Sequence, residues 1–484
     1  MESRFSGALQ ITSLDDFITP SQECIKPIEV PKAQTRKTGA KIKIQDDGDY
    51  VEINEYGSAN KLAKVEITLA DCLACSGCIT SAESVLISQQ SQDQLLRIFQ
   101  EKKQQLSADS PFIIVSLSVQ PILSIAQRYE LNTNEAALKI AGYFRELGAD
   151  MILDMTIAED FALMESAKEF VDRYKTYKSE GNNNKIIPML ASSCPGWICY
   201  AEKTHGNFIL PYISNTKSPQ QIMGSLIKNH FSNIKDISPE KIYHVTLMPC
   251  YDKKLEASRD EFYNKLKETR DVDCVITPVE LEQMLEQQKI NLNDIPLDSI
   301  DNPFGTCKSR SVSNIYRHEG SGSGGYANYI FDYAAKTLFD ITDAKIEFIV
   351  LRNPDFKEVI LQRDNEILLR FAIANGFRNI QNLVQKLKRK QCVYHYVEVM
   401  ACPAGCLNGG AQMRPQSGQQ SRELVTLLEN NYQELALIKP EDNEVMYDLY
   451  NSWLGGMNSE KTSAFLHTKY NAIEKTNIAL TMKW

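Results

Sequence analysis

Short apolar runs alternate with helical segments from Ser110 onward, an arrangement typical of parallel α/β folds. Seven of these runs are predicted to be buried strands, and they cover residues 112–117, 151–156, 186–191, 242–248, 272–276, 346–351 and 393–400. Two helix starts between them carry a hydroxyl residue, a first-turn proline and Gln or Glu at the third helical position, as in Ser218-Pro219-Gln220-Gln221 and Thr277-Pro278-Val279-Glu280. This order predicts a capping box at the start of each helix.

The first hundred residues follow a different pattern. Residues 29–60 are polar and predict an exposed connection with short strands. The apolar run at 65–69 then leads into a loop that contains Cys72, Cys75 and Cys78. The candidate chemistry of this region therefore lies in one short loop and not in a packed core.

Three closely spaced cysteines let one loop reach three corners of a cubane iron-sulfur cluster. Zinc is the alternative, but zinc sites usually pair two cysteines with a distant second pair, so the third cysteine would be redundant. A fourth ligand must come from elsewhere in the chain. Cys24 is the candidate, because it lies in the same N-terminal region and is followed by Pro27.

Three predicted strands end at turns that contain cysteine. The four cysteines that follow these ends are Cys194, Cys250, Cys402 and Cys406. Open parallel sheets bind ligands beyond the carboxyl ends of their strands, and a cubane cluster needs four thiolates. A single such cysteine would more often be a small packing residue, whereas four in matching positions favour a shared cluster.

Composition sets the class of protein. With 484 residues, of which 43% are hydrophobic and 24% charged, the chain is long enough for two or three globular domains. Its net charge of -9 gives no electrostatic reason to expect nucleic-acid or membrane binding. The first sixteen residues lack signal-peptide features, and twelve cysteines in such a chain indicate a reducing compartment. We expect a cytosolic protein.

Three cysteine motifs resemble the signature motifs of iron-only hydrogenases. They are Ser192 to Trp197, Met248 to Glu256, and Ala401 to Cys406 with its extension through Gly409 to Gln412. Lys217 to Gln221 and the turn Ser323-Gly324-Gly325 fit the same pattern, and the resemblance spans about residues 110 to 480. It implies two parallel α/β lobes, with a cluster in the cleft between them held by the four motif cysteines.

The single N-terminal cysteine loop is similar to that of the Nar1 branch, also called the nuclear prelamin A recognition factor-like proteins, which belong to the cytosolic iron-sulfur protein assembly machinery. The resemblance implies two [4Fe-4S] clusters, one held by Cys24, Cys72, Cys75 and Cys78 and one held by Cys194, Cys250, Cys402 and Cys406. It also implies four regions. Residues 1–105 form an N-terminal ferredoxin-like cluster region, and residues 106–250 and 251–440 form the two α/β lobes. Residues 441–484 form a helical segment similar to the hydrogenase small subunit, with a C-terminal tail.

One substitution bears on mechanism. Hydrogenases carry a second cysteine, a proton donor beside a diiron subsite, at the position of Ser193. A hydroxyl holds its proton more tightly than a thiol near neutral pH, so a non-catalytic role is favoured. Lys253 in the same family contacts a diatomic ligand of the subsite, and an ion pair with Glu256 in the cleft is the alternative.

The C-terminal region adds two features. His467 is predicted to be a hydrogen-bonded packing residue and not a ligand, because no cysteine or carboxylate motif accompanies it. The terminal Trp484 offers a ring and a free carboxylate that a partner pocket can bind. In this family such a tail docks the targeting complex, but Lys483 departs from the usual acidic or serine residue, so docking and a frayed tail both stay open.

The resemblance therefore implies an assembly factor that transfers clusters to cytosolic and nuclear apoproteins. Its expected partners are the upstream scaffold NTPases and the WD-repeat scaffold subunit of the targeting complex. Its location would be cytoplasmic, with a nuclear one left open. An active iron-only hydrogenase and a zinc-stabilised interaction module are the alternatives. The N-terminal cluster is expected to be the more exchangeable one. No function is assigned to Cys199, Cys274, Cys307 or Cys392.

Overall fold

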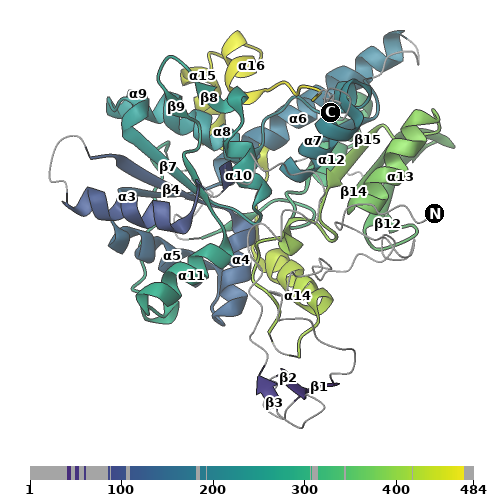
Figure 1. Cartoon of the computed structure of the whole chain (residues 1–484). Coiled ribbons are helices and arrows are strands. Elements are labelled where there is room, and N and C mark those ends of the chain that lie inside the picture. The colour runs from purple at the N-terminus through teal and green to yellow at the C-terminus, as the bar shows by residue number, and fades with distance from the viewer. Residues whose placement is uncertain are drawn as a thin grey trace, which may run out of the picture.

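The structure is a computed structural model of the whole chain (Figure 1). It describes residues 41–44, 50–53, 59–61, 86–87, 89–104, 110–180, 186–191, 193–305, 307, 314–342, 345–416 and 418–473. The predicted ligands Cys24, Cys72, Cys75 and Cys78 lie outside the described residues, and so does Trp484. Most of the described residues belong to the region that carries the three later cysteine motifs.

The first sheet has four parallel strands. Their order is β10 (Cys274–Ile276), β7 (Ile242–Leu247), β4 (Phe112–Leu117) and β5 (Met151–Asp154). Ile113 and Val115 of β4 pack on one face with α3 (Gln92–Gln104), α4 (Val119–Arg128), α5 (Thr133–Leu147) and α11 (Pro278–Gln288). Ile114 packs on the other face with α6 (Thr156–Glu180) and α8 (Pro219–Ser225). Apolar residues line both faces because helices cover both.

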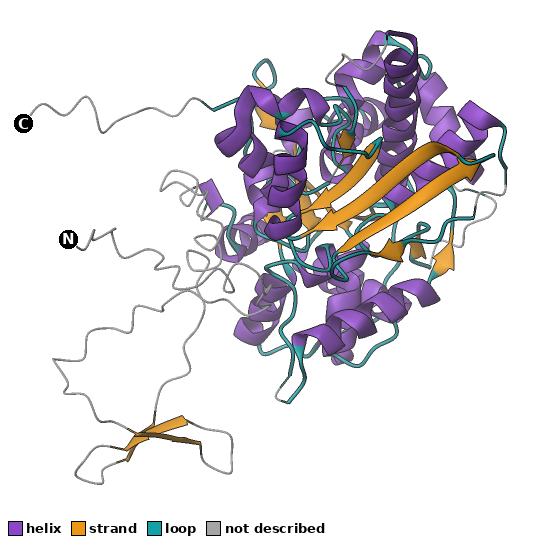
Figure 2. Cartoon of the chain, turned by 90° about the vertical axis from the view of Figure 1, so that its right-hand side faces the viewer, coloured by secondary structure: helices purple, strands orange, loops and turns teal. Residues whose placement is uncertain are grey.

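The second sheet is mixed. Its order is β12 (Ile349–Val350), β13 (Phe356–Arg363), β14 (Glu366–Asn375), β15 (Tyr396–Met400) and β6 (Met189–Ala191), and only the last three strands are parallel (Figure 2). On one face it packs with α13 (Phe377–Lys388), and on the other with α12 (Tyr326–Phe339) and α6. Helix α6 thus contributes to the core beneath both sheets.

The remaining elements are short or peripheral. Helices α7 (Pro195–Tyr200) and α10 (Asp252–Ala257) follow two of the motif cysteines, and α15 (Glu444–Ser452) and α16 (Glu460–Leu466) pack against α6. The others are α9 (Ser232–Lys235), α14 (Ser421–Glu434), β1 (Lys41–Ile44), β2 (Tyr50–Ile53), β3 (Ala59–Lys61), β8 (Tyr263–Asn264), β9 (Thr269–Arg270), β11 (Tyr316–Arg317) and β16 (Ala436–Leu437). None of the described helices combines the length and the apolar run that crossing a bilayer requires.

The predicted α/β architecture is confirmed, with two corrections to the strands. Six of the seven predicted strands lie in parallel pairings, but the run at 346–351 is wrong as a buried strand. Only Ile349 and Val350 form a strand there, an exposed one at the antiparallel edge of the second sheet. The hairpin of β13 and β14 was not predicted, although β14 pairs directly with the motif strand β15.

The two predicted capping boxes have different outcomes. The box of Thr277 and Glu280 is confirmed, since the Thr277 N–H donates to the Glu280 carboxylate at 3.0 Å. The box of Ser218 and Gln221 is wrong. The Ser218 hydroxyl donates instead to Glu256 at 2.6 Å, because α10 packs close enough to compete with the local cap.

The two sheets do not divide the chain at residue 250, where the boundary between the lobes was predicted. Strand β6 precedes this residue and belongs to the second sheet, whereas β10 follows it and belongs to the first. The chain therefore passes between the sheets more than once. As a result, motif turns that are far apart in sequence can meet at one place.

Candidate functional site

The four cysteines of the later motifs meet at the carboxyl ends of parallel strands. Cys250 follows β7 of the first sheet, Cys194 follows β6 of the second, and Cys402 and Cys406 follow β15. Burial raises the pKa of Cys250, and charge repulsion from Asp252 and from the other three thiols adds to that rise, so these groups lie near one another. Turns from the two sheets thus bring these four thiols to the same region, beyond the carboxyl ends of parallel strands.

The environment of these thiols disfavours their charged, thiolate form. Cys194 is 9% exposed, and the other three keep some contact with solvent. Burial raises the pKa of all four thiols, to about 12 for Cys406, and neighbouring Cys194 adds to that rise. Four such groups become thiolates together only when they bind a positively charged centre. The donor set, four soft sulfur ligands, fits an iron-sulfur cluster.

Zinc is the alternative occupant of this site. Within the described ranges, no three His, Cys, Asp or Glu side chains are arranged to hold a single metal ion. Four soft sulfur donors suit zinc as well as an iron-sulfur cluster, so a count of metal and sulfide separates the two.

The turn between Cys402 and Cys406 is held by groups from outside it. Ala404 has a φ of 56° and Gly405 a φ of 81°, so the chain doubles back between the two ligands. The Asp355 carboxylate accepts from the Ala404 N–H at 2.6 Å, and the Ser323 hydroxyl accepts from the Cys406 N–H at 3.0 Å. A Cβ atom on Gly405 would lie 1.9 Å from that hydroxyl, so no other residue fits.

Backbone contacts join the motif of Cys406 to that of Cys250. A Cβ atom on Gly409 would lie 2.4 Å from the carbonyl oxygen of Pro249, and the Ala411 N–H donates to this oxygen at 3.3 Å. Cys194 is tied in as well, because its sulfur accepts from the Ala401 N–H at 3.3 Å. The three motifs therefore form one continuous unit across the two sheets.

Lys253 and Glu256 form a buried ion pair beside the cysteines. The Lys253 ammonium lies 3.2 Å from each oxygen of the Glu256 carboxylate, and both residues are buried. This carboxylate also accepts from the Ser218 hydroxyl at 2.6 Å and the Gln220 amide at 3.2 Å. Of the two interpretations that the sequence left open for Lys253, the structure contains the ion pair.

Lys254 is a site neighbour that sequence reasoning missed. Its side chain is fully buried, and its ammonium donates to the Glu280 carboxylate at 2.7 Å and to the carbonyl oxygen of Gln90. The Gln90 amide donates in return to the Lys254 carbonyl at 3.0 Å and to Ser258 at 2.7 Å. The chain just beyond the N-terminal cysteine loop is thereby fixed to α10. A lysine inside a short amphipathic helix gave no signal of this.

The other singled-out residues lie around this centre. Ser193 precedes Cys194 and is partly exposed. His467 is hydrogen-bonded, as predicted, because its ring lies 2.8 Å from the Glu165 carboxylate, which also accepts from Tyr450. Cys274 is buried within β10.

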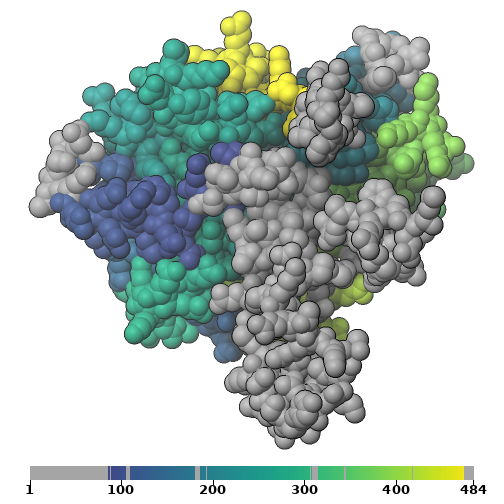
Figure 3. All heavy atoms as spheres, viewed as in Figure 1, coloured from purple at the N-terminus to yellow at the C-terminus, as the bar shows by residue number. Residues whose placement is uncertain are grey.

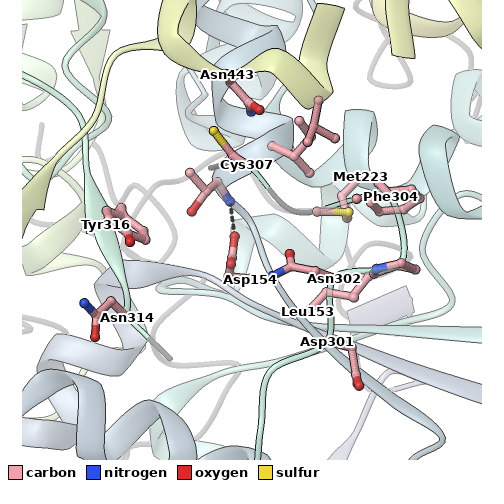
Figure 4. A pocket seen from close by; sticks show the side chains of 15 residues that line it. Leu153, Asp154, Met223, Asp301, Asn302, Phe304, Cys307, Asn314, Tyr316 and Asn443 are labelled. Carbon is pink, nitrogen blue, oxygen red and sulfur yellow. Dashed lines mark hydrogen bonds between the residues drawn. The ribbon is translucent and has the colours of Figure 1, made fainter. Parts of the chain in front are cut away.

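A separate cavity of about 50 Å³ lies at the carboxyl end of β5 (Figure 4). None of the four motif cysteines lines it. Its carboxylates already have partners, since Asp154 accepts from the Thr156 N–H at 2.7 Å, and Asp301 accepts from the Ile152 N–H at 2.8 Å and forms an ion pair with Arg145. We assign this cavity no role in the site.

Comparison with known proteins identifies the family. A model described as the iron only hydrogenase large subunit, C-terminal domain, matches residues 112–410, and one described as the iron hydrogenase small subunit matches residues 426–473. A probable cytosolic Fe-S cluster assembly factor of Aedes aegypti is 56% identical, and the cytosolic Fe-S cluster assembly factor narfl of Xenopus tropicalis is 51% identical, each over all of both chains. The chain belongs to this family of assembly factors. Its expected place in the Nar1 branch is confirmed.

The fold of this chain is similar to that of solved hydrogenase structures. An [FeFe]-hydrogenase studied for oxygen inactivation is 27% identical with a TM-score of 0.69, and a variant of the [FeFe]-hydrogenase HydA1 from Chlamydomonas reinhardtii is 26% identical with a TM-score of 0.67. Each match covers 79% of this chain and 99% of the hydrogenase. The expectation of a hydrogenase-type α/β fold is confirmed.

Proposed function

We propose that the protein binds two [4Fe-4S] clusters and acts in cytosolic iron-sulfur protein assembly, passing clusters toward cytosolic and nuclear apoproteins. The observation that carries this proposal is the meeting of Cys194, Cys250, Cys402 and Cys406 at one buried site. The names of relatives that match over the full length support the assembly role. The same names support a cytoplasmic location, and we propose the nucleus as a second one.

Each set of four cysteines would hold one cluster. The four motif cysteines would hold the buried cluster, and the strained turn around Gly405 would fix two of them in place. Cys24, Cys72, Cys75 and Cys78 would hold the second cluster. When bound, such clusters supply iron, sulfide and single-electron transfer. The buried position of the first set suits a retained cluster, whereas a cluster on the N-terminal loop suits exchange.

A working hydrogenase is the alternative, and two observations speak against it. Ser193 stands where a hydrogenase has its proton-donating cysteine, and its hydroxyl is a much weaker acid than a thiol. The Lys253 ammonium is engaged by both oxygens of Glu256. We propose that the protein is not an enzyme in the turnover sense.

The test counts metal on anaerobically purified protein. About eight iron and eight sulfide per chain, with negligible zinc, are expected for two cubanes. Cys250→Ser should retain about four of each, and Cys274→Ser, which alters a buried cysteine outside the site, should retain all eight. Zinc without sulfide would overturn the proposal, and iron in excess of sulfide would favour a diiron hydrogenase.

The proposed partners are the WD-repeat scaffold subunit of the targeting complex and the upstream scaffold NTPases. Trp484 is the proposed contact with the former, through its ring and terminal carboxylate. Deletion of Trp484 should weaken binding to that subunit about tenfold or more, since terminal aromatic anchors carry much of such binding energy. Unchanged affinity, measured by calorimetry with the purified subunit, would show that the tail does not dock.

A further inference from the structure

Four cations crowd the end of α13 and the turn that follows it. We name this the basic turn, and its cations are Lys386, Lys388, Arg389 and Lys390. Among the described residues, none of the four forms an ion pair with a carboxylate, in a chain whose net charge is -9. The basic turn is therefore an uncompensated positive region on an acidic protein.

Helix stability accounts for only part of this charge. Cations in the last turn of a helix interact favourably with its dipole, which explains Lys386 and Lys388. Arg389 and Lys390 lie beyond the helix end. Lys390 has a φ of 55°, and the Gln391 N–H donates to the carbonyl oxygen of Lys386 at 2.9 Å, which closes the turn. Two further cations are thus held in a fixed turn just beyond the last helical residue.

Two of the lysine ammonium groups lie over aromatic rings. The Lys386 ammonium lies 5.8 Å from the centre of the Phe356 ring and 5.7 Å from that of Tyr394, and the Lys388 ammonium lies 5.9 Å from the Phe208 ring. Such cation–π contacts restrict the side chains. The positive charges are therefore partly ordered before any partner binds.

The basic turn lies at the opposite end of β15 from the cysteines. It precedes the amino end of β15, while Cys402 follows the carboxyl end, and five residues of strand span about 16 Å. Figure 1 shows α13 at the outer edge of the molecule, and Figure 3 shows atoms of this light-green region at the surface. A partner bound there would leave the carboxyl ends of the strands uncovered.

We propose that the basic turn binds an acidic segment of a partner protein, with exposed Val393 contributing an apolar contact. Val393 lies three residues beyond Lys390 and is 53% exposed. Nucleic acid is disfavoured because single strands bind through stacking on exposed aromatic rings, whereas Phe356 and Tyr394 are less than 10% exposed. This surface goes beyond the cluster site and does not depend on it.

The test uses the full-length protein and a fluorescein-labelled peptide of about ten glutamates with a central leucine, followed by anisotropy at physiological ionic strength. K388Q/R389Q/K390Q should bind the peptide about tenfold more weakly, because close charge pairs carry most of such binding. K235Q/K265Q/K267Q removes the same charge from exposed positions elsewhere and should change affinity less than about twofold.

Three outcomes would overturn the proposal. They are equal losses in the two triple variants, no binding by the unchanged protein, and tighter binding of a single-stranded oligonucleotide of matched charge. Cys402→Ser should lose the buried cluster and still bind the peptide, which separates this proposal from the proposed function. Circular dichroism confirms that each variant is folded.

Discussion

At the scale of single residues, the site depends on a few positions where only one side chain fits. Gly405 is the clearest, since its positive φ and the nearby Ser323 hydroxyl both exclude a Cβ atom. The cysteines on either side of it follow one strand and can reach a common centre only because this turn is so tight. Sequence reasoning found the cysteines readily, but the Ser323 contact comes from a segment some eighty residues away.

Gly405→Ala should therefore destabilise the turn and lower the occupancy of the buried cluster. The left-handed backbone alone costs about 1–2 kcal/mol for a residue with a Cβ atom, and displacement of Ser323 adds to this. Gly410→Ala is the matched control, because nothing lies within 4 Å of a Cβ atom built at that position. Iron content and melting temperature are the measurements. Equal behaviour of the two variants would contradict the role given to the turn.

At the scale of elements, α6 connects the two sheets and carries a buried charged cluster. Asp160 on this helix lies 2.8 Å from the His318 ring and accepts from the Asn443 amide at 2.6 Å, while Glu159 lies 3.4 Å from the other ring nitrogen. Asn443 caps α15, so the cluster ties α6 to the C-terminal helices. Hydrophobic periodicity gave no sign of this cluster, because Asp160 and Asn443 are 283 residues apart.

This cluster should make stability depend on pH. Burial by itself would lower the pKa of His318, but hydrogen bonds to Asp160 and Glu159 raise it to about 9, above the ordinary value of 6.5. The stabilisation is therefore complete below pH 6.5 and is lost as the pH rises through 9, up to about 3 kcal/mol. His318→Gln should remove this dependence, measured by denaturant unfolding at several pH values.

His230→Gln is the control, because burial lowers the pKa of His230, which is opposite to the shift of His318. The control should keep the loss of stability at alkaline pH. A His318→Gln variant that still lost stability between pH 6.5 and 9 would show that another group titrates there.

At the scale of the whole molecule, the C-terminal segment spans the junction between α7 and α10, the two helices that follow Cys194 and Cys250. Glu202, which follows α7, accepts from Arg259, which follows α10, at 2.9 and 2.7 Å. The Asn471 N–H donates to the same carboxylate at 3.0 Å, and the Arg259 guanidinium lies over the Tyr470 ring. This buried pair joins the elements that follow Cys194 and Cys250.

Glu202→Gln should loosen this junction and speed the loss of the buried cluster to a chelator, because it leaves the Arg259 charge without its buried partner at a cost of about 3–5 kcal/mol. Glu261→Gln is the control, since Glu261 contacts the same guanidinium from a position that is 28% exposed. Absorbance at the cluster bands follows the loss.

In the unchanged protein, the chelator should remove the N-terminal cluster before the buried one. Equal rates of loss for the two clusters would contradict the proposed exchange of the N-terminal cluster.

Local patterns in the chain were enough to establish the α/β class, most strand positions and the family, and they singled out the four motif cysteines as candidates. Apolar runs and cysteine-bearing turns can be recognised without knowledge of the fold, because each lies within a few neighbouring residues. Only the folded chain showed that Lys253 pairs with Glu256, that Ser218 leaves its own helix cap, and that 346–351 is an exposed edge. These outcomes depend on which residues from distant parts of the chain hydrogen-bond to each side chain or cover each strand. Tertiary packing decides which residues those are.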